Sequence, residues 1–262
     1  MHILYRAEGE ATRPSTAHTW PISRIGHAVS EDGFRITQRL PEPVIDIADE
    51  EQPLTDGVED ARIALIDGVY HVVYCTTSIF PEVLSLSTSV DLVHFEKRGI
   101  LMPDYSQRTG GLLPEKVNGE YVLFHRVLPN MWVSRSPDLH NWHGSQILIH
   151  TQRNHWTEVK MGVGATPIRT DQAWVVFIHG KDRHGIYRLG VVWLDLEDPT
   201  KVIRIQQEPV LEPEEDYEIT GFVRNVVYTC GAAVLGDEVV VYYGCGDQYL
   251  AAAAVPLKDL RI

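Results

Sequence analysis

The chain has 262 residues, of which 44% are hydrophobic, and its 23 Lys and Arg against 36 Asp and Glu give a formal net charge of −13. This acidity argues against nucleic acid or an anionic membrane surface as a partner, because both attract basic proteins. No apolar run approaches the roughly 18 residues of a membrane span, and no basic stretch followed by an apolar one marks the N-terminus.

Four phrases along the chain predict β-hairpins. Each couples a tight-turn pair, such as Asp67 and Gly68, to an alternating run of aromatic and β-branched residues, the pattern of a turn followed by a strand. The phrases are DGVYHVVY at 67–74, NGEYVLFH at 118–125, DQAWVVFIH at 171–179 and GDEVVVYY at 236–243. Their equivalent positions are Tyr70, Tyr121, Trp174 and Val239. The intervals of 51, 53 and 65 residues are close to the roughly 40–50 residues of a four-stranded propeller blade.

A second phrase predicts the third strand of each repeat. AVSEDGFRI at 28–36, LSTSVDLVHF at 86–95 and WVSRSPDLHNW at 132–142 each close a strand with a Ser, an Asp and an aromatic residue. HILYR at 2–6 resembles the end of one more second strand, which brings the count to five. We therefore predict an all-β fold, a five-bladed β-propeller that forms one catalytic domain over 1–262 and whose first blade lacks its opening strand.

Propeller geometry predicts where a functional site lies. In each blade the innermost strand begins, and the next strand ends, on the same face, because the two run antiparallel. Residues just before the first strand and just after the second therefore converge on one mouth of the central channel. In chain order these positions hold Arg6, Asp60, Thr76, Arg108, Arg126, Lys160, His179, Asn225 and Asp247.

This set of residues favours attack by an anion on a sugar. One Asp among several cations suits proton donation on one side of a bond and anion attack on the other. An inverting glycosidase needs a second carboxylate to activate water. Phosphate needs no such base, and arginine forks with a lysine charge hold it well. The residues therefore indicate phosphorolysis.

The chain resembles glycoside hydrolase family 130, the five-bladed propellers that include β-mannoside phosphorylases and some β-mannosidases, and its matching motifs follow one another in the family's order. The resemblance covers nearly the whole chain. It is carried by ILYRAEGE, ISRIGHAVSEDG, GVEDARI, LLPEKVNGEYVLFHR, VKMGVGATPI, YRLGVVWLDLEDPTKVI, EPVLEPEEDYE, GFVRNVVYTCGAAV and VYYGCGD.

The resemblance implies a role for each residue. The family's proton donor falls on Asp60, and its phosphate ligands fall on Arg108, Arg126, Lys160 and His179. The implied reaction is an inverting transfer of a terminal mannosyl unit from a short β-mannoside to phosphate, giving α-mannose 1-phosphate. A β-1,4-mannooligosaccharide or mannosyl-glucose is the expected donor.

Sugar binding is predicted at four further residues. Arg6 and Asp247 match family residues that bind the mannosyl unit, and Arg24 and Asn225 complete the set. The expected partners are thus a small β-mannoside and phosphate, with a homo-oligomer left open. Inorganic phosphate is expected as co-substrate, with no other cofactor and no metal, since the histidines show no metal-binding spacing. Three cysteines cannot pair completely, and together with a sugar-phosphate product they favour the cytoplasm.

The chain departs from the family near the predicted site. Ala61 and Arg224 stand where proline is usual, and Leu113 where phenylalanine is common. An N-terminal strand with an Asn-Pro motif is also missing. The substitutions bear on the acceptor sugar more than on the reaction, whereas the missing strand leads us to expect reduced stability, reduced activity or an oligomer that covers the gap.

Structural alternatives stay open at this point. Asp60 could be a turn residue, Arg108 and Arg126 could form salt bridges between blades, and His179 could be a buried core histidine. For the whole protein, the alternatives are a β-mannosidase on the same scaffold and a non-catalytic carbohydrate-binding propeller. A glycosidase of another five-bladed family would need a second and a third carboxylate, for which Glu59 and Asp247 are the obvious candidates.

Overall fold

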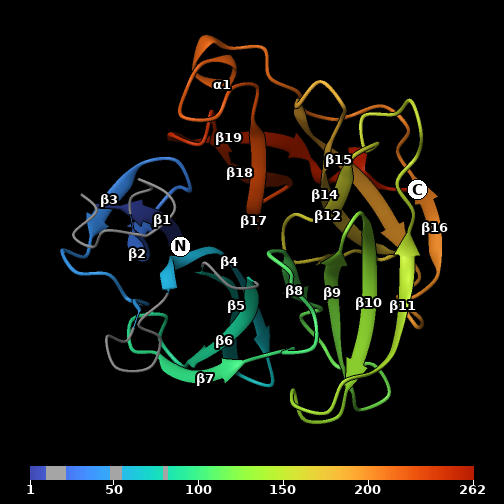
Figure 1. Cartoon of the computed structure of the whole chain (residues 1–262), viewed down its shortest axis with the longest axis horizontal. Coiled ribbons are helices and arrows are strands. Elements are labelled where there is room, and N and C mark those ends of the chain that lie inside the picture. The colour runs from blue at the N-terminus through green and yellow to red at the C-terminus, as the bar shows by residue number, and fades with distance from the viewer. Residues whose placement is uncertain (10–21, 48–54, 79–81) are drawn as a thin grey trace. The chain divides into compact units, whose positions relative to one another are not determined.

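The structure is a computed structural model in which strands make up nearly all of the regular structure (Figure 1). One short helix, α1 (Asp216–Ile219), and one turn of 3-10 helix (Leu257–Leu260) accompany them. None of the described helices is long and apolar enough to cross a membrane. The structure describes residues 1–9, 22–47, 55–78 and 82–262.

Two compact units make up the chain, Met1–Gly110 and Gly111–Ile262. Each unit buries apolar side chains of its own and so has its own hydrophobic core. The interpretation of residues 1–262 as one catalytic domain stays a prediction.

The first unit holds two antiparallel groups of strands. One group pairs in the order β1 (His2–Glu8), β2 (Ser23–Ser30) and β3 (Ile36–Arg39). The other pairs in the order β4 (Thr55–Ile66), β5 (Val69–Ser78), β6 (Val83–Ser89) and β7 (Glu96–Ile100). A parallel bridge between Ser23 and Gly57 joins the groups. Gly57 has φ 139°, and a Cβ there would lie 2.5 Å from the Ser23 carbonyl oxygen, so this junction requires glycine.

The second unit holds three antiparallel groups. The first contains β8 (Gly110–Leu112), which begins at the unit boundary, β9 (Tyr121–Val127), β10 (Asn130–Ser136) and β11 (His143–Ile149). The next contains β12 (Lys160–Val163), β13 (Ile168–Arg169), β14 (Trp174–Lys181), β15 (Tyr187–Leu194) and β16 (Val202–Ile205). The last contains β17 (Val227–Leu235), β18 (Glu238–Cys245) and β19 (Tyr249–Pro256). Phe124 and Trp174 lie in one buried cluster of this unit, and Phe177 and Trp193 in another.

These five groups confirm the five predicted repeats in number and order. The four hairpin phrases supply β5, β9, β14 and β18, each paired with the strand before it. Among the described residues the first and the last of these groups have three strands each.

The predicted tight turns have the backbone that their residues favour. Asp67 and Gly68 have φ 51° and 78°, and Asn118 and Gly119 have φ 53° and 83°. A positive φ at both central residues is the type I′ turn, whose twist matches the twist of the flanking strands. Turn chemistry therefore sets the register of these two hairpins.

The Ser and Asp of the second phrase form the same turn three times, at Asp32, Asp91 and Asp138. In each case the aspartate Oδ1 accepts the backbone N–H groups of the second and third residues after it, at 2.7–2.9 Å. These bonds favour the ionised carboxylate, and they lower the pKa of Asp32 and of Asp138. The phrase is therefore a structural signature of the repeat.

Candidate active site

Asp60 lies inside β4 at a β-bulge. The pairing of β4 with β5 shifts between Glu59 and Arg62, so two residues of β4 stand opposite one of β5. Asp60 has φ 61°, a left-handed conformation that is costly for most residues other than glycine, and the buried Arg62 donates Nη1 to its carbonyl oxygen at 2.8 Å. Bulges of this kind re-aim a side chain and are frequent beside active sites. Asp60 thus lies in a strand, at a bulge that requires a left-handed backbone, and is not a turn residue.

Glu59, directly before Asp60, contacts two of the residues predicted to bind substrate or phosphate, Arg6 and Arg108. Its buried carboxylate accepts a hydrogen bond from Arg6 Nη1 at 3.3 Å through Oε2 and pairs with Arg108 Nη2 through Oε1. Burial raises the pKa of Glu59, Asp60 adds to the rise, and the two guanidinium groups oppose it. Arg108 is also held by Glu82, whose Oε1 lies 3.1 Å from Nη1. In the first unit, Arg6 and Arg108 therefore contact one buried carboxylate, that of the residue directly before Asp60.

Arg24 is not part of this cluster. It lies opposite Ala7 in the pairing of β1 with β2, whereas Arg6 lies opposite Ile25. Because side chains alternate along a strand, Arg24 and Arg6 point to opposite faces of the sheet. Arg24 Nε pairs instead with Asp46 Oδ1 at 2.9 Å.

In the second unit, Arg126 and His179 form a buried pair. Arg126 in β9 donates Nη1 to Nε2 of His179 in β14 at 3.0 Å, and the two residues are 5% and 0% exposed. A guanidinium only donates, so the imidazole accepts at Nε2 and is neutral. The arginines that form ion pairs within this unit are Arg135, Arg169 and Arg188, and Arg126 is not one of them. A buried cation without an opposing carboxylate is costly, and an anionic ligand would offset that cost.

Two tyrosines and two lysines form a chain of contacts that begins at His179 of the buried pair. Lys160 in β12 stands directly opposite Lys181 in β14, and their Nζ atoms lie 5.2 and 5.1 Å from the ring centre of Tyr187. The Tyr187 ring meets Tyr228 edge-on at 6.2 Å, and Tyr228 lies 4.4 Å from the ring of His179. Like charges opposite each other on neighbouring strands repel, which again favours a bound anion. We define the cationic cluster as Arg126, Lys160, His179 and Lys181.

Lys181 is a candidate that sequence reasoning missed. It follows His179 by two positions in β14, so both side chains lie on one face of the strand. This alternation was visible in the sequence. The aromatic partners Tyr187 and Tyr228 come from other strands and carried no such signal.

Asn225 and Asp247 are brought together by backbone hydrogen bonds. Val223 N donates to Gly246 O, and Gly246 N donates to Val226 O, both at 3.0 Å. Asn225 O accepts from Tyr187 N at 3.0 Å, which ties this pair to the cationic cluster. Asn225 and Asp247 have φ 57° and 59°. With Asp60, they are three of the eight non-glycine residues with positive φ in the described part of the chain. All three are Asn or Asp, the residues other than glycine that adopt this conformation most readily.

Comparison with known proteins gives this arrangement a family. A family model described as beta-1,4-mannooligosaccharide phosphorylase, glycoside hydrolase family 130, matches residues 1–261. A 1,2-β-oligomannan phosphorylase of Thermoanaerobacter sp. (strain X514) is 39% identical over 100% of this chain and 87% of its own length. A β-1,2-mannobiose phosphorylase of the same strain is 38% identical with the same coverage. The solved β-1,2-mannobiose phosphorylase of Listeria innocua, in complex with β-1,2-mannobiose, has 31% identity and a TM-score of 0.85 over 93% of this chain and 70% of that one.

Fold and site first define a class, an all-β carbohydrate-active enzyme of the five-bladed propeller type. More specifically, the chain belongs to glycoside hydrolase family 130 and is a glycoside phosphorylase of that family. Its curated relatives act on β-mannosides, as their names state.

Proposed function

We propose that this protein is an inverting β-mannoside phosphorylase that transfers a terminal mannosyl unit to inorganic phosphate and releases α-mannose 1-phosphate. The observation that carries the proposal is the buried Arg126, which donates to a neutral His179 and has no carboxylate partner in its own unit. Lys160 and Lys181 add two charges beside it. Together these groups supply donors and positive charge for phosphate.

In the proposed reaction, Asp60 supplies the proton. A phosphate oxygen forms a bond to the anomeric carbon of mannose while the bond from that carbon to the glycosidic oxygen breaks. The leaving oxygen takes the proton from Asp60, and because phosphate is already an anion, no second carboxylate is needed to activate the nucleophile. Arg108 takes part in phosphate binding by exchanging its contacts with Glu59 and Glu82 for phosphate oxygens. Arg6, Asn225 and Asp247 are the proposed mannosyl ligands, and Arg24 is left out because it lies on the other face of the sheet.

For the linkage, we propose β-1,2. Relatives named for β-1,2-mannosides share 34–39% identity with this chain. Those named for β-1,4-mannooligosaccharides and for mannosyl-glucose share 29% and 26%. We further propose that the enzyme works in the cytoplasm, where a sugar phosphate is retained and used, with inorganic phosphate as co-substrate and no metal.

The test is incubation of the protein with β-1,2-mannobiose, β-1,4-mannobiose and mannosyl-glucose, with and without phosphate. The expected result is mannose 1-phosphate from β-1,2-mannobiose in phosphate only. Free mannose at equal rates in both buffers would show a hydrolase instead. A folded sample that releases no product but binds the sugars, and whose Asp60→Asn variant binds them equally, would identify a non-catalytic carbohydrate-binding propeller.

A further inference from the structure

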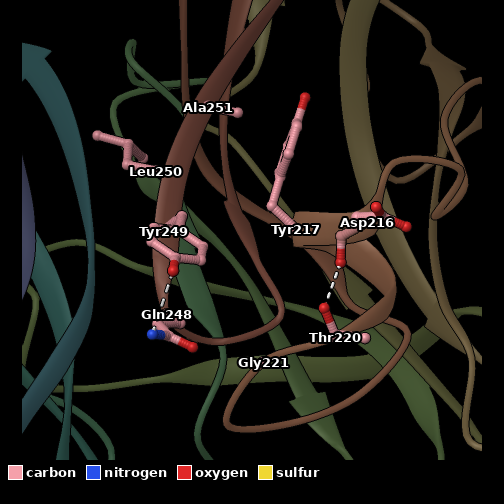
Figure 2. A pocket seen from close by; sticks show the side chains of 8 residues that line it. All are labelled: Asp216, Tyr217, Thr220, Gly221, Gln248, Tyr249, Leu250 and Ala251. Carbon is pink, nitrogen blue, oxygen red and sulfur yellow. Dashed lines mark hydrogen bonds between the residues drawn. The ribbon is translucent and has the colours of Figure 1, made fainter.

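The proposed mannosyl ligands of the two units have different surroundings. In the second unit, Asp247 directly precedes Gln248, which lines an open hollow together with Tyr249 (Figure 2). In the first unit, Arg6 is held in a row of ion pairs. A sugar that binds Arg6 therefore meets a side chain that is already paired, and its partners bear on how well it binds.

Five side chains of alternating charge form this row. Arg6 Nε lies 3.2 Å from Glu8 Oε1, and Arg6 Nη1 donates to Glu59 Oε2 at 3.3 Å. Arg108 pairs through Nη2 with Glu59 Oε1 and through Nη1 with Glu82 Oε1. We define the ion-pair row as Glu8, Arg6, Glu59, Arg108 and Glu82. All five residues belong to Met1–Gly110, so the row lies within one unit.

Glu59 stands at the centre of the row and is its most buried carboxylate. Its side chain is 8% exposed, against 32% for Glu8 and 33% for Glu82. Its place is fixed by β4, in which it directly precedes the bulge at Asp60. A buried carboxylate cannot turn to water when one of its partners leaves, so a change at one arginine of the row affects the other.

The two arginines that share Glu59 serve different substrates in the proposed function, Arg6 the mannosyl unit and Arg108 the phosphate. Their like charges repel each other across the shared carboxylate. The Arg6–Glu59 hydrogen bond of 3.3 Å is longer than the roughly 2.7–2.9 Å of most charge-assisted bonds. Bound phosphate neutralises Arg108 and draws it from Glu59, which leaves the carboxylate to Arg6.

We infer that Glu59 is a positioning residue that couples the two substrates, so that phosphate bound at Arg108 fixes Arg6 and tightens the binding of the β-mannoside. A side chain that is already fixed loses less conformational freedom when the sugar binds. Because coupling between two ligands is reciprocal, the β-mannoside tightens the binding of phosphate by the same factor. This inference rests on the proposed function.

The experiment measures binding by calorimetry in an Asp60→Asn variant, which turns the substrates over too slowly to disturb a titration. The probe is β-linked mannobiose, in the linkage that the enzyme cleaves, with and without saturating inorganic phosphate. We expect phosphate to lower the Kd for mannobiose about 3- to 10-fold, the gain from fixing one side chain in advance. The reverse titration, of phosphate with and without mannobiose, should give the same factor.

Glu59→Gln, added to this variant, should bring the factor to within about twofold of one, because the amide carries no charge for either arginine. A purely structural role of Glu59 would weaken both substrates and leave the factor unchanged. Glu82→Gln is the matched control, since it removes a carboxylate that pairs with Arg108 and leaves the Arg6–Glu59 contact in place, and it should keep the factor.

Arg6→Met tests the other end of the coupling and does not depend on the folding of a Glu59 variant. It should weaken mannobiose binding and abolish the factor, while the Kd for phosphate alone stays within about twofold of its value in the Asp60→Asn variant. Retention of the factor without the Arg6 guanidinium would show that the coupling does not run through the ion-pair row.

Three further outcomes would overturn the inference. One is an equal or weaker affinity for mannobiose in the presence of phosphate in the Asp60→Asn variant. The others are a factor that survives Glu59→Gln, and a factor that Glu82→Gln abolishes to the same extent. Each of these leaves the phosphorylase proposal standing, because the unchanged protein still forms mannose 1-phosphate. If the unchanged protein forms none, the proposed function itself fails and takes this inference with it.

Discussion

Arg126→Met removes a buried guanidinium whose hydrogen-bond partner is the neutral ring of His179 at 3.0 Å. Since no carboxylate of the unit pairs with Arg126, the protein without phosphate bears the cost of burying this charge. Removing the charge relieves its cost of burial, while His179 Nε2 loses its donor at a cost of about 1–3 kcal/mol, so we expect the two effects to offset and the free energy of unfolding to stay nearly constant. Charged hydrogen bonds to phosphate are worth roughly 1.5–3 kcal/mol, so the KM for phosphate should rise about 10- to 150-fold.

Two assays check this prediction. Urea unfolding in phosphate-free buffer gives the stability, and the initial rate of mannose 1-phosphate formation against phosphate concentration gives the KM. Arg135→Met is the control, because Arg135 Nη2 pairs with Asp198 Oδ1 at 3.0 Å and its side chain is 29% exposed. The loss of such a pair should change stability by less than about 1 kcal/mol and leave the KM for phosphate unchanged. If Arg126→Met instead lowers stability by more than about 1 kcal/mol with an unchanged KM, the guanidinium is structural and the reasoning is refuted.

Three further predictions concern the reaction, the pH dependence of stability and the packing of Gly221 on Gly246. Asp60→Asn should lower mannose 1-phosphate formation by about 10²- to 10⁴-fold while phosphate still raises the melting temperature, and a loss of less than tenfold would remove Asp60 from proton transfer. Burial lowers the pKa of His125 from 6.5 to about 4, so the unfolded chain binds the proton more tightly. The contribution of His125 to the free energy of unfolding is therefore complete above pH 6.5. It decreases by about 3 kcal/mol as the pH falls from 6.5 toward 4. Urea unfolding at both ends of this pH range should show that His125→Gln loses less unfolding free energy on acidification than the unchanged protein does. Equal losses in the two proteins would contradict the role of His125. Gly221→Ala should destabilise the protein by about 1–3 kcal/mol because its Cβ would lie 2.3 Å from the Gly246 carbonyl oxygen, and an unchanged melting temperature would show that this contact relaxes freely.

Local chemistry made much of the fold predictable. The pairs Asp67 and Gly68, and Asn118 and Gly119, name their turn type directly, because few residues adopt a positive φ at both positions. The Ser and Asp of the second phrase satisfy backbone donors within a few residues, so that turn also forms from local sequence. Repetition of these signals then gave the number of strand groups.

The candidate site was less visible because it depends on pairs distant in sequence. The sequence offers Glu59 only as a carboxylate for an alternative glycosidase, and only the fold brings it to Arg6 and Arg108, 53 and 49 positions away. The two faces of a strand also matter. Arg6 pairs with Ile25, and Arg24 directly precedes Ile25 in the same strand. Because successive side chains of a strand point to opposite faces, Arg24 lies on the face opposite to Arg6.

The left-handed backbone at Asp60, Asn225 and Asp247 restricts which substitutions each position accepts. Asparagine, aspartate and glycine adopt this conformation at low cost, and other residues pay roughly 1 kcal/mol or more. A saturation library at these three positions, selected for folding alone, should therefore return a narrow set of Asn, Asp and Gly. The same library selected for turnover should return a narrower set still, and the difference between the two would separate conformational constraint from chemical constraint at each residue.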